Sequence, residues 1–231
     1  MTFKEKCSIR TGQILSFAEN TNVSFIILKG LFKVRSNKPE TLNISPVFFS
    51  SVIDNYIQTL MVDIYKMFDN SNKHEKDTES TYYLIKDMRN HLNLLDDTAV
   101  SVNQYRHVSH EEGYQKAFST TKEMLDYYIK AIEENQAKIT SIQKRRSKFY
   151  AHWDRSTLND VKKAFKKHPV CLDDIEELLV LTTNICVALY RYFHQKEIYI
   201  PFIHEANDFE KTINCIEAYQ KSIDQNDQFV L

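Results

Sequence analysis

The chain has 231 residues, a formal net charge of −1 and 42% hydrophobic residues, which is enough for one large domain with its own core. Only 3 Gly and 4 Pro occur, so the composition favours helices joined by short polar turns and leaves little room for a Gly-rich phosphate loop. Four cysteines without C-x-x-C spacing, no secretion signal and no apolar run of roughly 18 residues indicate a cytoplasmic protein with reduced thiols and no membrane partner.

The first part of the chain predicts a polar lead-in followed by helical segments. Residues 1–10 form the lead-in, and residues 11–34 fit either a strand or a broken helix. Ser45 and Pro46 supply an N-cap and a proline at the first helical position, and they open the clearest helix of the chain. Its apolar face consists of Phe49, Ile53, Tyr56, Ile57, Leu60, Ile64 and Phe68.

The rest of the chain predicts further helices. One covers residues 80–95, residues 96–110 connect it to the next, and a long helix runs over residues 111–149. Three later helices are expected where capping-box pairs occur, at Thr157 with Asp160, Asp173 with Glu176, and Asn207 with Glu210. The first of these is short and basic and ends near His168. Nothing marks a domain boundary, so we expect residues 1–231 to form a single all-α domain, an up-and-down helical bundle with additional helices.

One residue of the long helix breaks its apolar pattern. A stripe with alternating three- and four-residue spacing consists of Leu125, Tyr128, Ile132, Asn135, Ile139, Ile142, Arg146 and Phe149. Arg146 therefore occupies a position where the pattern requires Ile or Leu. A guanidinium aimed at packed surface costs several kcal/mol unless it meets an anion or an acceptor, so we expect a carboxylate or a phosphate at Arg146. Arg145 lies about 100° round the helix, on an ordinary solvated face.

The residues that follow Arg146 carry a family motif. The string Arg-Ser-Lys-Phe-Tyr-Ala-His over residues 146–152 fits the arginine, four to six residues, histidine motif of the HEPN domain. With Trp153 and Asp154 added, it resembles the form found in HEPN proteins of bacterial abortive-infection systems. Ser147 departs from the Asn, Asp or His that is common there, and Asp154 stands where toxins paired with small nucleotidyltransferases have Tyr. The resemblance covers most of the chain, least clearly residues 1–40, and it favours a helix over the ambiguous segment near the start.

The resemblance implies a metal-independent endoribonuclease that needs no cofactor and no metal ion. In such a site the ribose 2′-OH attacks the adjacent phosphorus and leaves a 2′,3′-cyclic phosphate. The implied catalytic pair is His152, which transfers protons near neutral pH, and Arg146, which stabilises charge on the phosphoryl oxygens. Arg145 and Lys148 are expected to support RNA binding, Lys148 through a second phosphate contact. Asp154 is expected to orient His152 or to pair with Arg146.

The resemblance also implies partners. HEPN domains pair two protomers so that both motifs line one cleft, which predicts a homodimer in which Phe149, Tyr150 and Trp153 supply apolar contact. RNA as a partner agrees with the local charge, because residues 138–168 carry +8 whereas the remainder of the chain carries −9. The implied biological role is phage defence or the toxin of a toxin–antitoxin system, with an antitoxin protein as a further partner.

The residues taken alone leave other readings open. Arg146 and His152 can be structural, with the arginine bonded to helix C-terminal carbonyls and the histidine stabilising the negative helix end. The lysines of residues 138–168 can form a solvated face. Residues 107–112 hold two His and two Glu, but no second helix supplies metal ligands, so a capped and solvated helix start is the simpler interpretation. The alternative function is a non-catalytic dimeric HEPN scaffold or an RNA-binding module.

Overall fold

The structure is a computed structural model that describes residues 1–69, 80–108, 113–146, 166, 168–197 and 203–227. Within these residues, helices make up nearly all the regular structure and one two-stranded antiparallel sheet is present. The elements are, in chain order, α1 (Phe3–Asn37), α2 (Pro39–Asn43), α3 (Pro46–Met67), α4 (Thr81–Asn90), η2 (Leu92–Leu94), β1 (Val100–Tyr105), β2 (Gly113–Phe118), α5 (Thr121–Glu134), α6 (Gln136–Arg145), α9 (Leu172–His194) and α10 (Ile203–Asp227). The predicted mostly helical fold is confirmed, and the sheet is the exception to it.

The helix α1 forms the long edge of the bundle. It has 35 residues, a length of about 52 Å at 1.5 Å per residue. Thr2 caps it by accepting a hydrogen bond from the backbone of Glu5, whose carboxylate returns one to the Thr2 backbone. The helix predicted for residues 11–34 is therefore confirmed, whereas the polar lead-in predicted for residues 1–10 is wrong, because the capping box starts the helix at Phe3.

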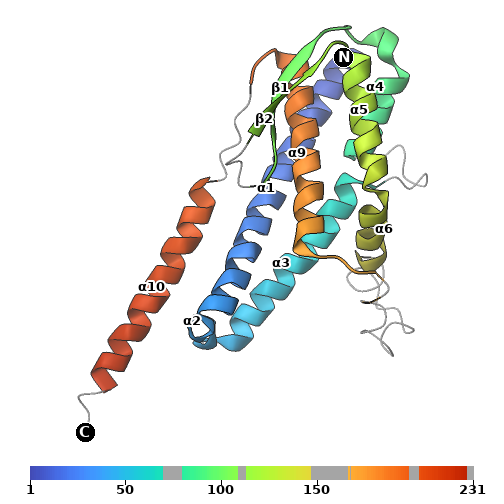
Figure 1. The fold of residues 1–231 in the computed structure, drawn as a ribbon. Helices are drawn as coiled ribbons and strands as arrows, with labels where there is room; N and C mark the ends of the chain where they lie inside the picture. The colour runs from blue at the N-terminus through green and yellow to red at the C-terminus, as the bar shows by residue number, and fades with distance from the viewer. Residues whose placement is uncertain (70–79, 109–112, 147–165, 167, 198–202, 228–231) are drawn as a thin grey trace.

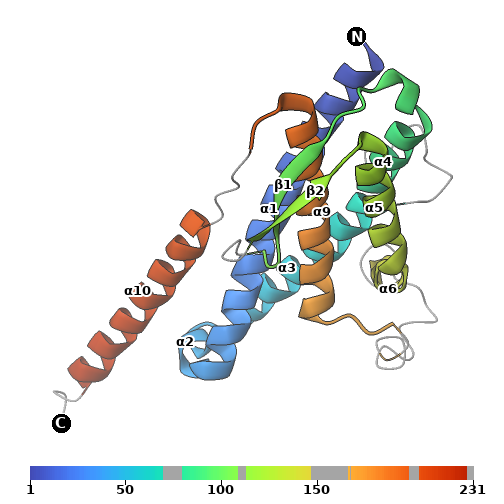
Figure 2. The same cartoon turned by 45° about the horizontal axis from the view of Figure 1, so that its top comes forward.

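The helices pack around α9. In Figures 1 and 2, α9 lies between α1 on one side and the successive helices α5 and α6 on the other, while α3 passes behind it. The core runs through all of these elements, and its largest fully buried side chains include Phe25, Leu28, Leu60, Ile64, Ile85 and Tyr128. The hairpin of β1 and β2 covers the end of α9 that lies near the N-terminus.

Two predicted helix starts agree with the structure and two do not. The helix α3 begins at Pro46 as predicted, although the Ser45 side chain makes no capping hydrogen bond. Ser80 caps α4 by accepting from the Tyr83 backbone at 3.2 Å. The cap of α9 is Cys171, paired with Asp174 in a capping box, and not the predicted Asp173. The last helix, α10, begins at Ile203, before the predicted start at Asn207.

The β1–β2 hairpin replaces two predicted features. Residues 96–110 were expected to be a connection and residues 111–118 the start of the long helix, but β1 pairs with β2 in the register Val100↔Phe118 to Tyr105↔Gly113. Alternation decides the outcome, because Val100, Val102 and Gln104 of β1 are buried on one face together with Phe118 of β2. A strand pair buries these side chains against α9, which a helix over the same residues would not do.

Asn184 of α9 fastens the hairpin to the helices. Its side-chain Oδ1 accepts from the Tyr105 backbone N–H at 2.7 Å, and its Nδ2 donates to the Tyr105 carbonyl at 2.9 Å. The Asn184 carbonyl accepts from the buried hydroxyl of Tyr128, which in turn accepts from Gln104 of β1. The two bonds to Asn184 satisfy the backbone groups of Tyr105, the last residue of β1, which has no second strand to pair with on this side.

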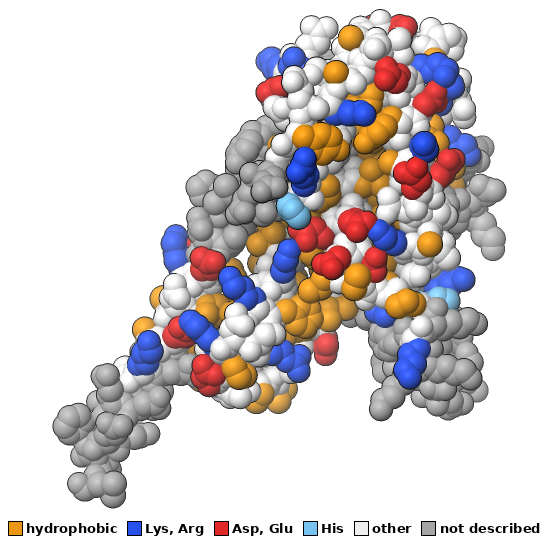
Figure 3. Space-filling view, viewed as in Figure 1, with side chains coloured by type: hydrophobic (Ala, Val, Ile, Leu, Met, Phe, Trp, Pro, Cys, Tyr) orange, Lys and Arg blue, Asp and Glu red, His pale blue; other side chains and the backbone are white. Residues whose placement is uncertain are grey.

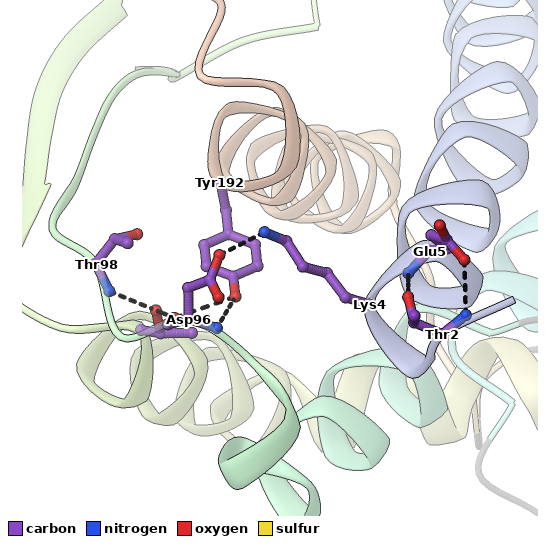
Figure 4. A network of polar contacts seen from close by, with 7 residues as sticks. Thr2, Lys4, Glu5, Asp96, Thr98 and Tyr192 are labelled. Carbon is purple, nitrogen blue, oxygen red and sulfur yellow. Dashed lines mark hydrogen bonds and ion pairs between the residues drawn. The ribbon is translucent and has the colours of Figure 1, made fainter.

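A second polar network holds the chain ahead of β1. The Tyr192 hydroxyl of α9 accepts from the Asp96 backbone N–H at 2.9 Å and donates to the Asp96 carbonyl at 3.1 Å, and Lys4 of α1 forms an ion pair with the Asp96 carboxylate (Figure 4). Thr121, the first residue of α5, donates to the same carbonyl at 2.7 Å. The segment that leads into the hairpin is thus tied to α1, α5 and α9 at once, and partial burial raises the pKa of Tyr192.

The helix α10 rests on α1 at two places. Figures 1 and 2 draw it apart from the rest of the bundle, alongside α1 and α2. At one place Gly30 leaves room for the Phe209 ring, whose Cε1 would lie 2.5 Å from a Cβ built on that glycine. At the other, Lys38 donates to both carboxylate oxygens of Glu217, at 2.8 and 2.9 Å. Between them lies a cleft of about 250 Å³.

Replacing Asn184 with Leu should lower the free energy of unfolding by about 2–5 kcal/mol, because two buried backbone groups of Tyr105 lose their partners, at about 1–3 kcal/mol each. Chemical denaturation measures this change, and hydrogen exchange of the hairpin amides should locate it. Asn103→Leu on the exposed face of β1 is the control and should change stability by less than about 0.5 kcal/mol. Equal losses in the two variants would show that Asn184 does not fasten the hairpin.

Alanine at the two α1 glycines should act with opposite signs. Gly12→Ala should stabilise the protein by about 0.5–1 kcal/mol, since a Cβ there meets nothing within 4 Å and alanine favours the helix. Gly30→Ala should lose that gain because the Phe209 ring must move. In a Phe209→Ala background, Gly30→Ala should regain it, as thermal or chemical unfolding of the four variants would show. A gain from Gly30→Ala in the parent protein would contradict the close packing of α10.

Candidate functional site

The stripe that was predicted along one long helix is buried, although the helix is broken. Asn135 ends α5, and its Nδ2 donates to the Ala131 carbonyl at 3.0 Å before α6 begins at Gln136. The apolar positions of the stripe keep facing the core across this break. Their exposed fractions are at most 2%, for Leu125, Tyr128, Ile132, Ile139 and Ile142. The next position of the stripe is Arg146.

Arg146 points into packed surface, as its place in the stripe predicts. It follows the last residue of α6 with helical backbone angles, and its side chain is half-buried. The guanidinium carbon lies 4.6 Å from the centre of the Tyr65 ring of α3. Among the described residues, its Nε is buried and has no hydrogen-bond partner. A buried donor without an acceptor costs about 1–3 kcal/mol. The described residues therefore leave the Arg146 Nε without an acceptor.

Among the described residues, the contact of the Arg146 guanidinium is an aromatic ring, while Asp154, the carboxylate expected to pair with it, lies outside them. The sequence predicts a carboxylate or a phosphate at this guanidinium, and the structure places an aromatic ring there. A ring face attracts the cation through its quadrupole without neutralising the charge. The N–H groups lie in the plane of the guanidinium, and a ring face offers them no lone pair. Among the described residues, Arg146 therefore forms no ion pair, and its buried Nε donates to no acceptor.

Arg145, unlike Arg146, binds a backbone carbonyl. Its side chain is half-buried, and its Nε donates to the backbone carbonyl of His168 at 2.6 Å. This bond ties the end of α6 to the residues just before α9. The solvated face predicted for Arg145 is therefore wrong, because the chain returns past α6 at His168. Of the two neighbouring arginines, Arg145 makes the carbonyl contact that the structural reading of the motif had assigned to Arg146.

The ring beneath Arg146 is itself fixed. The Tyr65 hydroxyl donates to Oδ2 of Asp69 at 3.2 Å, and Asp69 is buried with 4% of its surface exposed. The Asp69 carbonyl accepts from the Ser80 hydroxyl at 2.9 Å, and Ser80 caps α4. The end of α3 and the start of α4 thus hold the ring in place. Neither Tyr65 nor Asp69 carries a signal in the sequence that would mark it as part of the site.

The remaining predicted site residues lie outside the described part of the chain. His152, Lys148 and Asp154 fall in residues 147–165, as does most of the short basic helix predicted to end near His168. Within the basic segment that is described, Lys138 forms an ion pair with Glu177 of α9, whereas Lys144 is exposed. On the face drawn in Figure 3, basic and acidic side chains alternate over the bundle.

Other kinds of site find little support among the described residues. His107 lies 3.8 Å from a Glu176 oxygen, but the described residues contain no group of three His, Cys, Asp or Glu that could hold a metal ion. His110, Glu111 and Glu112 lie outside them.

Burial raises the pKa of Cys186 to about 12, so this thiol stays protonated at neutral pH and is a poor nucleophile. In the described part of the chain, no helix has the length and apolar composition needed to cross a membrane.

Comparison with known proteins gives one match. The family model HEPN_AbiU2, described as AbiU2, matches residues 19–209, from within α1 to Phe209 of α10. No match was found among curated proteins or among solved structures. The matched range contains the whole motif segment, which begins at Arg146, and also Tyr65 of α3.

Methionine substitutions at the two arginines should separate their roles without any assay of activity. Arg146→Met removes an unmet buried donor and leaves a side chain that packs on the Tyr65 ring, so the free energy of unfolding should stay the same or rise by up to about 2 kcal/mol. Arg145→Met removes the hydrogen bond to the His168 carbonyl and should lower the free energy of unfolding by about 1–2 kcal/mol. Urea denaturation measures both. Equal losses at the two positions would contradict this division of roles.

Proposed function

The chain belongs to the HEPN_AbiU2 family, an abortive-infection family of HEPN type, and from this membership we propose that it is a metal-independent endoribonuclease. The observation that carries the proposal is the state of Arg146. Its side chain is half-buried, its guanidinium carbon lies 4.6 Å from the centre of the Tyr65 ring, and among the described residues its Nε has no acceptor. A phosphate oxygen supplies the missing acceptor and the negative charge together.

The reaction is an in-line transesterification of RNA. The ribose 2′-OH loses its proton and attacks the adjacent phosphorus, and the bond from phosphorus to the 5′-oxygen breaks. The products are a 2′,3′-cyclic phosphate and a 5′-OH end, and the proton that leaves the 2′-OH is balanced by one delivered to the 5′-oxygen. His152 transfers protons because an imidazole titrates near neutral pH. Arg146 stabilises the charge that gathers on the phosphoryl oxygens.

The neighbouring motif residues have supporting roles in this proposal. Lys148 makes a second phosphate contact, and Asp154 orients His152 or pairs with Arg146. Arg145 contributes by fixing the end of α6 through its bond to the His168 carbonyl, which also fixes the backbone next to Arg146. This positioning role is added to its proposed support of RNA binding.

The proposed assembly is a homodimer in which two copies of the Arg146 and His152 pair line one cleft. One histidine and one arginine make an incomplete site for a reaction that moves two protons, and a second copy supplies the missing groups. The proposed biological role is growth arrest, either as phage defence or as the toxin of a toxin–antitoxin pair with an antitoxin protein as its regulator. Uncontrolled RNA cleavage is damaging to the cell, which is why such a partner is part of the proposal.

The proposal predicts that the purified protein cleaves RNA in the presence of EDTA and leaves 2′,3′-cyclic phosphate ends. Arg146→Ala should reduce the cleavage rate roughly 10²- to 10³-fold because a preorganised cation is lost. His152→Ala should reduce it roughly 10²- to 10⁴-fold because the proton-transfer group is lost. End-labelled RNAs of varied sequence provide the measurement, and growth after induced expression should recover in the same two variants.

Lys130→Ala is the matched control. It removes a lysine of α5 whose side chain is 76% exposed and which pairs only along its own helix with Glu134 at 3.7 Å among the described residues, so cleavage should be unchanged. Light scattering should give the same mass for every variant. Cleavage that survives His152→Ala would refute the site, and a wild-type protein that cleaves none of the RNAs would favour a non-catalytic dimeric scaffold or RNA-binding module.

A further inference from the structure

The guanidinium of Arg146 at the end of α6 contacts the ring of Tyr65 of α3. The guanidinium carbon lies 4.6 Å from the ring centre, close enough for a favourable cation–π interaction. The arginine Nε is also buried. Contact with the ring and burial both restrict a long side chain that would otherwise sample many rotamers.

Tyr65 is anchored on its other side. Its hydroxyl donates to the buried Asp69, whose carbonyl is held by Ser80 at the start of α4. Ile64 and Met67, which flank Tyr65 on α3, are each 1% exposed, so the backbone that carries the ring belongs to the core. The ring is therefore a fixed surface, and the guanidinium that stacks on it takes its position from the core.

From these contacts we propose that Tyr65 is the positioning residue of the candidate site. Its ring holds the Arg146 guanidinium plane in the orientation that presents in-plane N–H donors to a phosphate of the RNA. The inference rests on the proposed function and adds a residue that the motif does not contain. A ring performs this task better than a carboxylate, because a carboxylate would occupy the donors that the phosphate needs.

The experiment uses three variants of the full-length protein on the labelled RNA. Tyr65→Leu removes the ring and should lower kcat about 10- to 100-fold, a loss of the size that misplacing a catalytic group produces, with KM changed by less than about threefold. Tyr65→Phe keeps the ring and should stay within about threefold of the parent. Tyr56→Leu makes the same substitution at another half-buried tyrosine of α3, about 13 Å along the helix axis, and should leave kcat unchanged.

A double-mutant cycle separates positioning from folding. In an Arg146→Ala background, Tyr65→Leu should cause no further loss of kcat, because no guanidinium remains to be positioned. Equal losses from Tyr65→Leu with and without Arg146, or failure of Tyr65→Phe to retain activity, would overturn the proposal.

A binding assay keeps the inference testable if the wild-type protein cleaves no RNA. A 2′-deoxy oligonucleotide cannot be cleaved, and at low salt Tyr65→Leu should weaken its binding about 3- to 10-fold in the parent and not in the Arg146→Ala background. That result without cleavage would refute the proposed enzyme and retain the positioning role. Equal weakening in both backgrounds, or no binding by the wild-type protein, would refute the positioning role as well.

Discussion

Burial of the apolar stripe on α5 and α6 determines where Arg146 points. Five side chains of this stripe, from Leu125 to Ile142, are almost completely removed from water, and each large aliphatic or aromatic group contributes roughly 1.5–3 kcal/mol. The helix cannot rotate to expose Arg146 without exposing these side chains as well. The cost of directing a guanidinium at packed surface is therefore offset by the rest of the stripe, and the position of the cation is set by hydrophobic packing several residues away.

The surrounding elements turn that direction into a defined site. The helix α3 supplies the Tyr65 ring, and the chain just before α9 supplies the carbonyl that binds Arg145. The helix α9 is fixed in turn by its contacts with α1 and by the Asn184 bonds to the hairpin. Two adjacent arginines with the same chemistry thus face different surroundings. The range that matches HEPN_AbiU2, residues 19–209, includes both arginines and Tyr65.

Much of the fold could be predicted from local signals. Pro46 predicted the start of α3, the periodicity of residues 80–95 predicted α4, and the stripe predicted the buried face of α5 and α6, because each signal depends on residues close together in the sequence. The capping box of Thr2 and Glu5 was also present, but the first residues look polar as a group and the box was not recognised. The hairpin was missed because the alternation of Val100 and Val102 is short and no Asn-Gly or Asp-Gly turn marks it.

The site could be predicted only in part. The direction of Arg146 followed from the period of its own helix, so it was accessible from the sequence. The contact of Arg146 with the Tyr65 ring and the bond of Arg145 to the His168 carbonyl could not be predicted. Both join residues far apart in the sequence, and no local pattern indicates which distant residues meet. Asn135 is an instructive intermediate case: it was placed in the stripe correctly, yet its tendency to bond backbone carbonyls ends α5 there.

The unmet Nε donor of Arg146 also bears on the energetics of the whole chain. Among the described residues this buried group has no acceptor, which costs about 1–3 kcal/mol. An anion that binds there, as the proposed function requires, would remove this cost. Anion binding and folding would then be linked, and the bound state would be stabilised beyond the contacts that the anion itself makes.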